Sequence, residues 1–191
     1  MAWGIHGKSQ PTTIGGIDPG ASGALAFLCP KTWELEVHDM PHYTEEVNGK
    51  KRKRVDTHAL ADLINGGNLA VISTEKVHAM PQMDVKSIFS FGRFYGQLEM
   101  AATMAGVEFM ETDPAVWKRK MGVNSDKDFS RLRCGILVPA AQPILLRKTD
   151  HDRAEAIMLA LFCAFNHGLM PKNITLKETG VAAPKSKSRK K

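Results

Sequence analysis

The stretch GGIDPGASGALAFL, Gly15 to Leu28, holds one acidic residue, Asp18, between two apolar segments. Residues 13–16 lead into a predicted strand that ends at Asp18, and residues 24–29 predict a second strand. The glycine-rich PGASG between them favours a tight turn, and therefore a β-hairpin. Asp18 could stabilise that turn through a hydrogen bond to the backbone two residues further on. Alternatively, its carboxylate at the strand end could be a functional group.

Strand and helix patterns alternate along the rest of the chain. Residues 41–54 are polar and basic, and we expect them to form a loop. Because strands come first and then alternate with helices, the fold class is α/β, with a mixed five-stranded sheet flanked by helices. The further expected strands cover residues 33–40, 69–77 and 107–113, and the expected helices cover 56–67, 87–106, 114–120, a segment starting near 127, and 148–168.

The bulk composition indicates one globular domain. The chain has 191 residues, 43% of them hydrophobic, and its three scattered cysteines support neither a disulfide framework nor a zinc site. We expect the domain at residues 13–170, an N-terminal extension at 1–12 and a basic, disordered tail at 171–191. No apolar run is long enough to span a bilayer, and the first residues lack the apolar core of a secretory signal. The expected location is the cytoplasm, with an organelle left open.

The net charge of +6 is compatible with a nucleic-acid partner. Much of the excess lies in two runs, GKKRKRV at 49–55 and PKSKSRKK at 184–191. A solvated tail explains its own charge without a function. The KKRKR run (50–54) could clamp backbone phosphates or simply be solvated.

Three other acidic residues could join Asp18. Glu75 ends a predicted strand, and Asp152 and Glu155 lie three residues apart on one face of the last helix, as do His151 and Glu155 at a spacing of four. Crowded carboxylates repel one another and lose solvation, and a divalent cation removes both problems. The alternatives are a surface pair of Glu75 with its neighbouring lysine, and solvated acids that favour the N-terminal dipole of the helix.

The sequence blocks around these residues resemble the RuvC family of Holliday junction resolvases, most closely its phage and chloroplast branch. GIDPGASGALAFL resembles the opening strand of that family, and VISTEKV resembles the strand that ends in its second metal carboxylate. SFGRFYGQLEMAA, TDPAVWKRKMGV and KTDHDRAEAIMLALF are similar to its later helices and junctions. The blocks follow the family order from residue 14 to residue 169.

This resemblance implies an RNase H-like fold and a homodimer that acts on four-way DNA junctions. Each site would use two Mg²⁺ ions, with Mn²⁺ as a substitute, to hydrolyse one phosphodiester and leave 5′-phosphate and 3′-hydroxyl ends. Asp18, Glu75 and Glu155 carry over as metal ligands. Asp152 is our choice for the fourth ligand, with His151 as the alternative. The rival functions are a nuclease for RNA–DNA hybrids or other branched DNA, and a non-catalytic junction-binding module.

Further residues follow from the resemblance as candidates for contacts with DNA. Lys118 and Lys127 resemble family lysines near the scissile phosphate, where a positive charge offsets charge developing on the phosphate oxygens. His78 occupies the position of a base-stacking phenylalanine in bacterial relatives. The 87–106 helix lies at or near the dimer seam in resolvases, and we expect Phe89 to fall off its core face. The basic face would be extended by Arg119, Lys120, Arg131 and Arg133.

Overall fold

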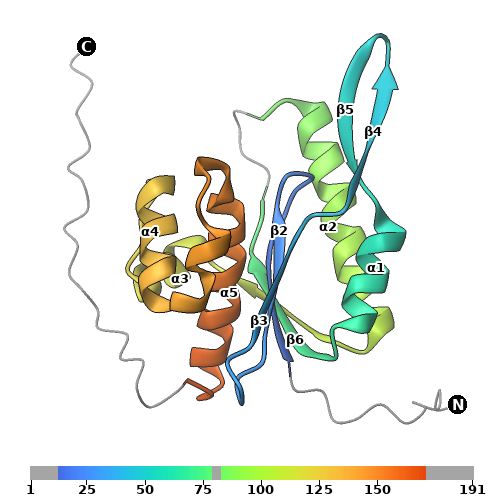
Figure 1. Cartoon of the computed structure of the whole chain (residues 1–191). Helices are drawn as coiled ribbons and strands as arrows, with labels where there is room; N and C mark the ends of the chain where they lie inside the picture. The colour runs from blue at the N-terminus through green and yellow to red at the C-terminus, as the bar shows by residue number, and fades with distance from the viewer. Residues whose placement is uncertain (1–12, 79–82, 171–191) are drawn as a thin grey trace, which may run out of the picture.

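A computed structural model describes residues 13–78 and 83–170 as a three-layer arrangement of helices, sheet and helices (Figure 1). The mixed five-stranded sheet predicted from the sequence is confirmed, in the strand order β3-β2-β1-β6-β7. Pairs β1–β2 and β2–β3 are antiparallel, whereas β1–β6 and β6–β7 are parallel. The sheet strands are β1 (Thr13–Asp18), β2 (Ala24–Leu28), β3 (Leu35–Asp39), β6 (Leu69–Glu75) and β7 (Glu108–Thr112).

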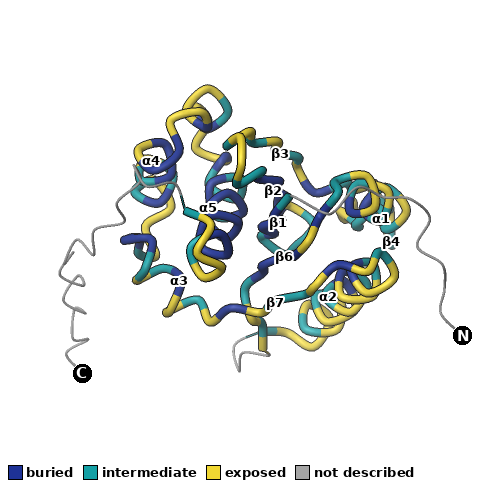
Figure 2. Tube along the Cα trace, turned by 90° about the horizontal axis from the view of Figure 1, so that it is seen from below, coloured by how far each residue is buried: buried dark blue, intermediate teal, exposed yellow. Residues whose placement is uncertain are grey.

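The helices lie on both faces of the sheet, and the view in Figure 2 separates the two groups. Helices α1 and α2 cover one face, and α3, α4 and α5 lie on the other. None of the helices in the described part of the chain is long and apolar enough to cross a membrane. The helices are α1 (Thr57–Gly66), α2 (Val85–Ala105), α3 (Pro114–Met121), α4 (Lys127–Leu137) and α5 (His151–Asn166), with short 3-10 helices η1 (Pro139–Ile144) and η2 (Lys148–Asp150).

The alternation of side chains along β2 divides the hydrophobic core into two clusters. Ala24, Ala26 and Leu28 face the cluster formed with α3, α4 and α5. Leu25 and Phe27 face the cluster formed with α1 and α2. All five residues are buried, because the strand lies in the interior of the sheet with helices on both faces.

Helix α5 packs directly on the backbone of β1. Nearly all of its residues from Ala154 to Ala164 are buried, so this helix is apolar on almost every side, as expected for a helix enclosed between a sheet and α4. A Cβ atom at Gly16 would lie 2.1 Å from the carbonyl oxygen of Ala156. Glycine at this position therefore allows the close approach that fixes α5 over the sheet.

The prediction of a loop over residues 41–54 is wrong. Strands β4 (His42–Val47) and β5 (Lys50–Val55) form an antiparallel hairpin that extends beyond the main sheet (Figure 1). Asn48 and Gly49 both have positive φ, 53° and 70°. An Asn-Gly pair with this geometry is the preferred two-residue turn of a hairpin. The turn residues therefore favour a hairpin here, although its strands lack the alternating hydrophobic pattern of a half-buried strand.

The ends of the helices follow side-chain capping. Aspartates precede α1, α2, α3 and α4, and each accepts hydrogen bonds from backbone N–H groups of the first turn. The cap of α4 is Asp126, whose carboxylate accepts from the N–H of Phe129 at 3.0 Å. The last helix begins at His151 rather than at Lys148, because Asp150 accepts hydrogen bonds from the backbone and guanidinium of Arg147 and closes a separate 3-10 turn.

Candidate functional site: a carboxylate cluster at the strand ends

The strand period places Asp18 and Glu75 on the same face of the sheet. Asp18 follows Ile14 and Gly16 at intervals of two, and these residues face α5. Glu75 follows Val71 in the same way on β6. The two strands are parallel and adjacent, with Ile17 opposite Thr74, so both carboxylates stand at neighbouring carboxyl ends. In open α/β sheets, this edge is where ligands bind.

Helix α5 brings the other two carboxylates to the same place. Asp152 and Glu155 lie in its first two turns, directly before the alanines that pack on β1. The guanidinium of Arg153 donates from Nε and an Nη atom to the two carboxylate oxygens of Asp39, at 2.6 and 2.7 Å. This bidentate pair ties the start of α5 to the end of β3, which fixes the direction in which the helix presents its acids.

The turn after Asp18 is closed tightly against that residue. A Cβ atom at Gly23 would lie 2.0 Å from the backbone carbonyl oxygen of Asp18. The N–H of Gly23 donates to Gly20 at 3.0 Å, and its carbonyl accepts from Met40 at 2.9 Å. Gly23 therefore serves close packing around the strand end, whereas Gly20, with a φ of 141°, serves the conformation of the turn.

The charges of the cluster act strongly on Asp18. Burial, followed by the charges of Glu155, Asp152 and Glu75 and a hydrogen bond with Asp152, raises the pKa of Asp18 to about 8. Burial also raises the pKa of Glu155, although Lys118 acts in the opposite direction. The predicted set of four carboxylates is thus brought within electrostatic reach, and Asp152 is the one that bonds to Asp18.

Helix α3 supplies two partners for Glu75. The buried indole of Trp117 donates from Nε1 to Oε1 of Glu75 at 2.9 Å. The ammonium of Lys118 lies 3.2 Å from the same carboxylate oxygen and 3.9 Å from Oε2 of Glu155. Lys118 therefore lies within the cluster, at the place where two of its acids meet.

His151 and Lys127 form a second polar contact at the edge of the cluster. The Nζ atom of Lys127 lies 2.7 Å from Nε2 of His151, and Nδ1 of His151 lies 3.0 Å from the carbonyl of Lys148. The same Nε2 is 2.9 Å from Oδ1 of Asp152, so His151 joins the lysine to the acids.

The donor set fits a hard divalent cation. Four carboxylates come together from two strands and one helix, and the charges of the other three add to burial in raising the pKa of Asp18. Mg²⁺ prefers such oxygens and would supply positive charge among them. Within residues 13–78 and 83–170, no three or more acidic, histidine or cysteine side chains are already gathered around one point as metal ligands.

The other predicted residues lie outside the cluster. His78 is exposed and lines a small pocket of about 230 Å³ beside α2. Arg119 is exposed on α3, while Lys120 places its ammonium 4.1 Å from the ring centroid of Phe165. The guanidinium of Arg131 donates to the carbonyl of Leu145 and to Asp128, and Arg133 bonds the carbonyl of Met121. These contacts hold α4 within the fold.

Sequence reasoning missed the residues that support the acids. Trp117 holds Glu75 through a hydrogen bond, and the Arg153–Asp39 pair holds the start of α5. Neither role was predicted from the sequence. Trp117 and Arg153 both lie inside the blocks TDPAVWKRKMGV and KTDHDRAEAIMLALF, next to predicted site residues. Their position there was the available signal, but only the folded chain shows which carboxylate each one contacts.

Comparisons with known proteins place this geometry on a known fold. No protein-family model matches the chain, and no curated protein does so. RuvC of Thermus thermophilus, in a structure described as a complex with a Holliday junction substrate, is 17% identical, with a TM-score of 0.55 over 83% of this chain and 96% of that chain. A second structure of Thermus thermophilus RuvC has a TM-score of 0.54, 17% identity and coverage of 82% and 96%. The chain therefore has the RNase H-like fold of RuvC.

Proposed function

We propose that this protein is a Mg²⁺-dependent endonuclease that resolves four-way DNA junctions by paired phosphodiester hydrolysis, leaving 5′-phosphate and 3′-hydroxyl ends. The observation that carries the proposal is the carboxylate cluster of Asp18, Glu75, Asp152 and Glu155 at the strand ends of a RuvC-like fold, with the pKa of Asp18 raised to about 8. Perturbed carboxylates gathered at such an edge are typical of catalytic sites. The Thermus neighbour was solved with a Holliday junction, which supports DNA of this shape as the substrate.

The residues divide into ligands and supports. The four carboxylates would hold two Mg²⁺ ions, and Asp152 is favoured over His151 because its charge acts on Asp18, while Nε2 of His151 contacts Lys127. Such a metal pair supplies the positive charge that stabilises the attacking and leaving oxygens in phosphodiester hydrolysis. Trp117 orients Glu75, and Lys118 offers an ammonium at the cluster to phosphate oxygens.

A homodimer is part of the proposal, and one face of α2 supports it. This exposed face includes two glycines, Gly92 and Gly96, beside which an added Cβ atom would meet open space. Exposed apolar stripes of this kind mark protein interfaces, and small residues allow two helices to approach closely. The predicted exposure of Phe89 is confirmed. The exposed fractions on this face are Val85 81%, Phe89 72%, Met100 59% and Met104 79%.

The test is cleavage of a synthetic four-way junction with and without Mg²⁺, with both nicks mapped and the solution mass measured. Wild-type protein should make two symmetric nicks only with the metal. Asp18→Asn should abolish cleavage and still bind the junction, whereas Asp62→Asn, which removes an exposed acid of α1, should cleave normally. Cleavage of an RNA–DNA hybrid in preference to the junction would favour the rival nuclease, and junction binding without any cleavage would favour a binding module.

A further inference from the structure

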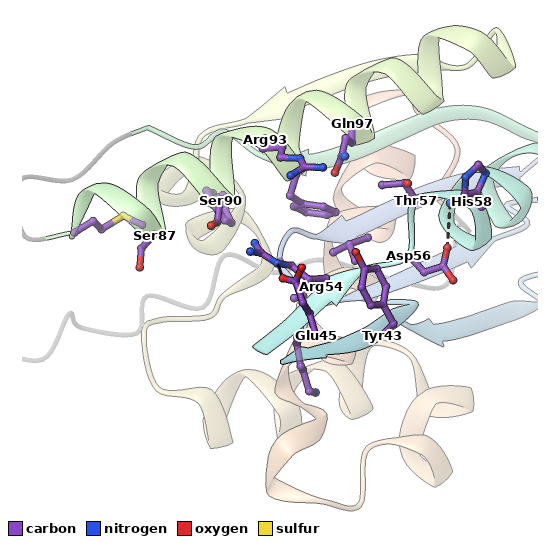
Figure 3. Close-up of a pocket in the computed structure, with 17 residues that line it drawn as sticks. Tyr43, Glu45, Arg54, Asp56, Thr57, His58, Ser87, Ser90, Arg93 and Gln97 are labelled. Carbon is purple, nitrogen blue, oxygen red and sulfur yellow. Dashed lines mark hydrogen bonds and ion pairs between the residues drawn. The ribbon is translucent and has the colours of Figure 1, made fainter. Parts of the chain in front are cut away.

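A groove separates the β4–β5 hairpin from α2, on the side of the molecule where the hairpin extends beyond the sheet (Figure 3). Its volume is about 660 Å³. Gly20 and Ala21, in the turn that follows Asp18, line one part of it. The groove is therefore adjacent in sequence and in space to the strand end that carries the proposed catalytic carboxylate.

The hairpin wall of this groove is basic. Cross-strand partners share a face of a hairpin, and Tyr43 pairs with Arg54, Glu45 with Arg52 and Val47 with Lys50. Tyr43, Glu45, Lys53 and Arg54 line the groove. The register assigns Arg52 and Lys50 to the same face as Arg54, further along the hairpin than the lining residues. Arg54, Arg52 and Lys50 follow one another at intervals of two residues along the strand, which is roughly 7 Å.

One acid and two free cations remain on that face. Arg54 donates from Nε to Glu45 at 2.8 Å, so this pair largely neutralises itself. The side chains of Lys50 and Arg52 make no hydrogen bond or ion pair with any residue that the structure describes. Their charge is available to a ligand.

The helix wall contributes polar groups of a complementary kind. Ser87, Ser90 and Gln97 line the groove from α2, and Arg93 adds a guanidinium that has no partner among the described residues (Figure 3). Hydroxyl, amide and guanidinium groups of this type are common donors to phosphate oxygens. Both walls thus present donors and positive charge to the space between them.

We propose that this groove binds the sugar–phosphate backbone of the DNA strand that the carboxylate cluster cuts, a proposal that rests on the proposed function. The chemistry recognised is a chain of phosphates without regard to sequence: Arg52 and Lys50 contact it from the ribbon and Arg93 from the helix. An acidic protein segment shares part of this chemistry, but the continuity of the groove with the turn after Asp18 favours DNA.

The test compares two double variants of equal charge loss in the cleavage-deficient Asp18→Asn protein. Arg52→Gln with Arg93→Gln removes one cation from the hairpin face that carries Glu45 and Arg54, and one from the helix wall of the groove. Lys51→Gln with Lys86→Gln removes one cation from the opposite face of the hairpin and one from α2 outside the groove. Binding of a fluorescent four-way junction is measured by anisotropy across a salt series, and circular dichroism with thermal melting confirms that both proteins fold.

The groove variant should lose about tenfold in affinity at roughly 0.1 M salt, and the slope of log K against log salt should fall by about two. The control variant should stay within about threefold of the parent. Equal losses in the two variants, or no loss in the groove variant, would overturn the proposal. The proposal would also be overturned if the protein bound polyglutamate through Arg52 and Arg93 and did not bind DNA through them. The groove would then serve an acidic protein.

A separate experiment distinguishes failure of the proposed nuclease function from failure of the groove proposal. Protein with an intact Asp18 is assayed for junction cleavage with Mg²⁺. If it cleaves nothing while the groove variant still loses DNA binding selectively, the groove proposal stands and the proposed function falls. If it cleaves the junction and the groove variant binds as tightly as the control, the reverse holds.

Discussion

The carboxylate cluster and the β4–β5 ribbon are both strongly charged, but only the cluster is set against the core. Asp18 lies where β1, β6 and α5 pack together, and its pKa is raised by burial and by neighbouring acids. Lys50 to Lys53 on the ribbon are exposed and surrounded by solvent. The comparison teaches that packing positions the acids, whereas turn chemistry and strand register position the cations. Substitutions should therefore act on the two regions in different ways.

The largest effect is expected where packing is tightest. Gly16→Ala places a methyl group 2.1 Å from the carbonyl of Ala156, so α5 must move away from β1. We expect a loss of at least about 3 kcal/mol in the free energy of unfolding, measured by urea denaturation. Gly66→Ala in α1 is the matched control, because its added methyl meets open space. Similar stability in the two variants would contradict the close contact between α5 and the sheet.

The same packing explains why the cluster was predictable from sequence. A strand alternation that buries Ile14 and brings Gly16 under the helix must also turn Asp18 toward α5, and the spacing of Asp152 and Glu155 fixes their common face. The hydrophobic pattern assigned these acids to a strand end and a helix face, and the family resemblance gathered them into one candidate site. Local sequence and tertiary packing give the same answer in this part of the chain.

The ribbon was not predictable in the same way, because its strands carry no apolar alternation. The only local signal was the Asn48–Gly49 pair, and the loop prediction overlooked it. The hydrogen bond between Trp117 and Glu75 was not predicted for a different reason. Trp117 is 42 residues away along the chain, and its indole reaches that carboxylate only when α3 packs beside β6. Such contacts depend on tertiary structure and leave no periodic trace.

The second prediction concerns pH and uses the buried acid. In the folded protein the pKa of Asp18 is about 8, against about 3.8 in the unfolded chain, so the fold holds a proton that the unfolded chain releases. The stability from this group is complete below about pH 4 and is lost as pH rises toward 8, at up to about 1.4 kcal/mol per pH unit. Urea denaturation in EDTA from pH 5 to 8 measures this loss.

Asp18→Asn is the control for that titration, because the amide cannot ionise. Its stability should depend less on pH over the same range, and added Mg²⁺ should restore wild-type stability at pH 8 by binding the folded state. If wild-type and Asp18→Asn proteins show parallel pH curves in EDTA, the pKa of Asp18 is not raised in the folded protein.

A smaller effect is expected from the indole that supports Glu75. Trp117→Phe keeps most of the buried volume and removes the 2.9 Å hydrogen bond to the carboxylate. Residues that orient metal ligands typically contribute about tenfold or more to metal affinity. We expect the Mg²⁺ concentration for half-maximal cleavage, and for half-maximal thermal stabilisation, to rise about tenfold. Trp33→Phe provides the comparison, and equal shifts in both variants would make Trp117 a packing residue only.

The smallest effect on stability is expected on the ribbon. Glu45→Gln breaks the ion pair with Arg54, whose side chains are 41% and 32% exposed. Exposed pairs contribute roughly 0–1 kcal/mol, so the midpoint of thermal unfolding should barely move. The same change removes the single acid from the groove face of the hairpin and frees a guanidinium, so the affinity for a four-way junction should rise about twofold to threefold at low salt.

Glu46→Gln tests whether the gain in DNA affinity depends on the face of the hairpin or only on net charge. Glu46 pairs with Lys51 on the opposite face of the same ribbon. Both variants raise the net charge by one, and both leave the turn intact. If the two proteins gain equally in affinity, the ribbon acts only through its total charge, and its two faces are equivalent. If only Glu45→Gln gains, the register of the hairpin selects which cations meet the DNA, just as the register of β1 selects which acid meets α5.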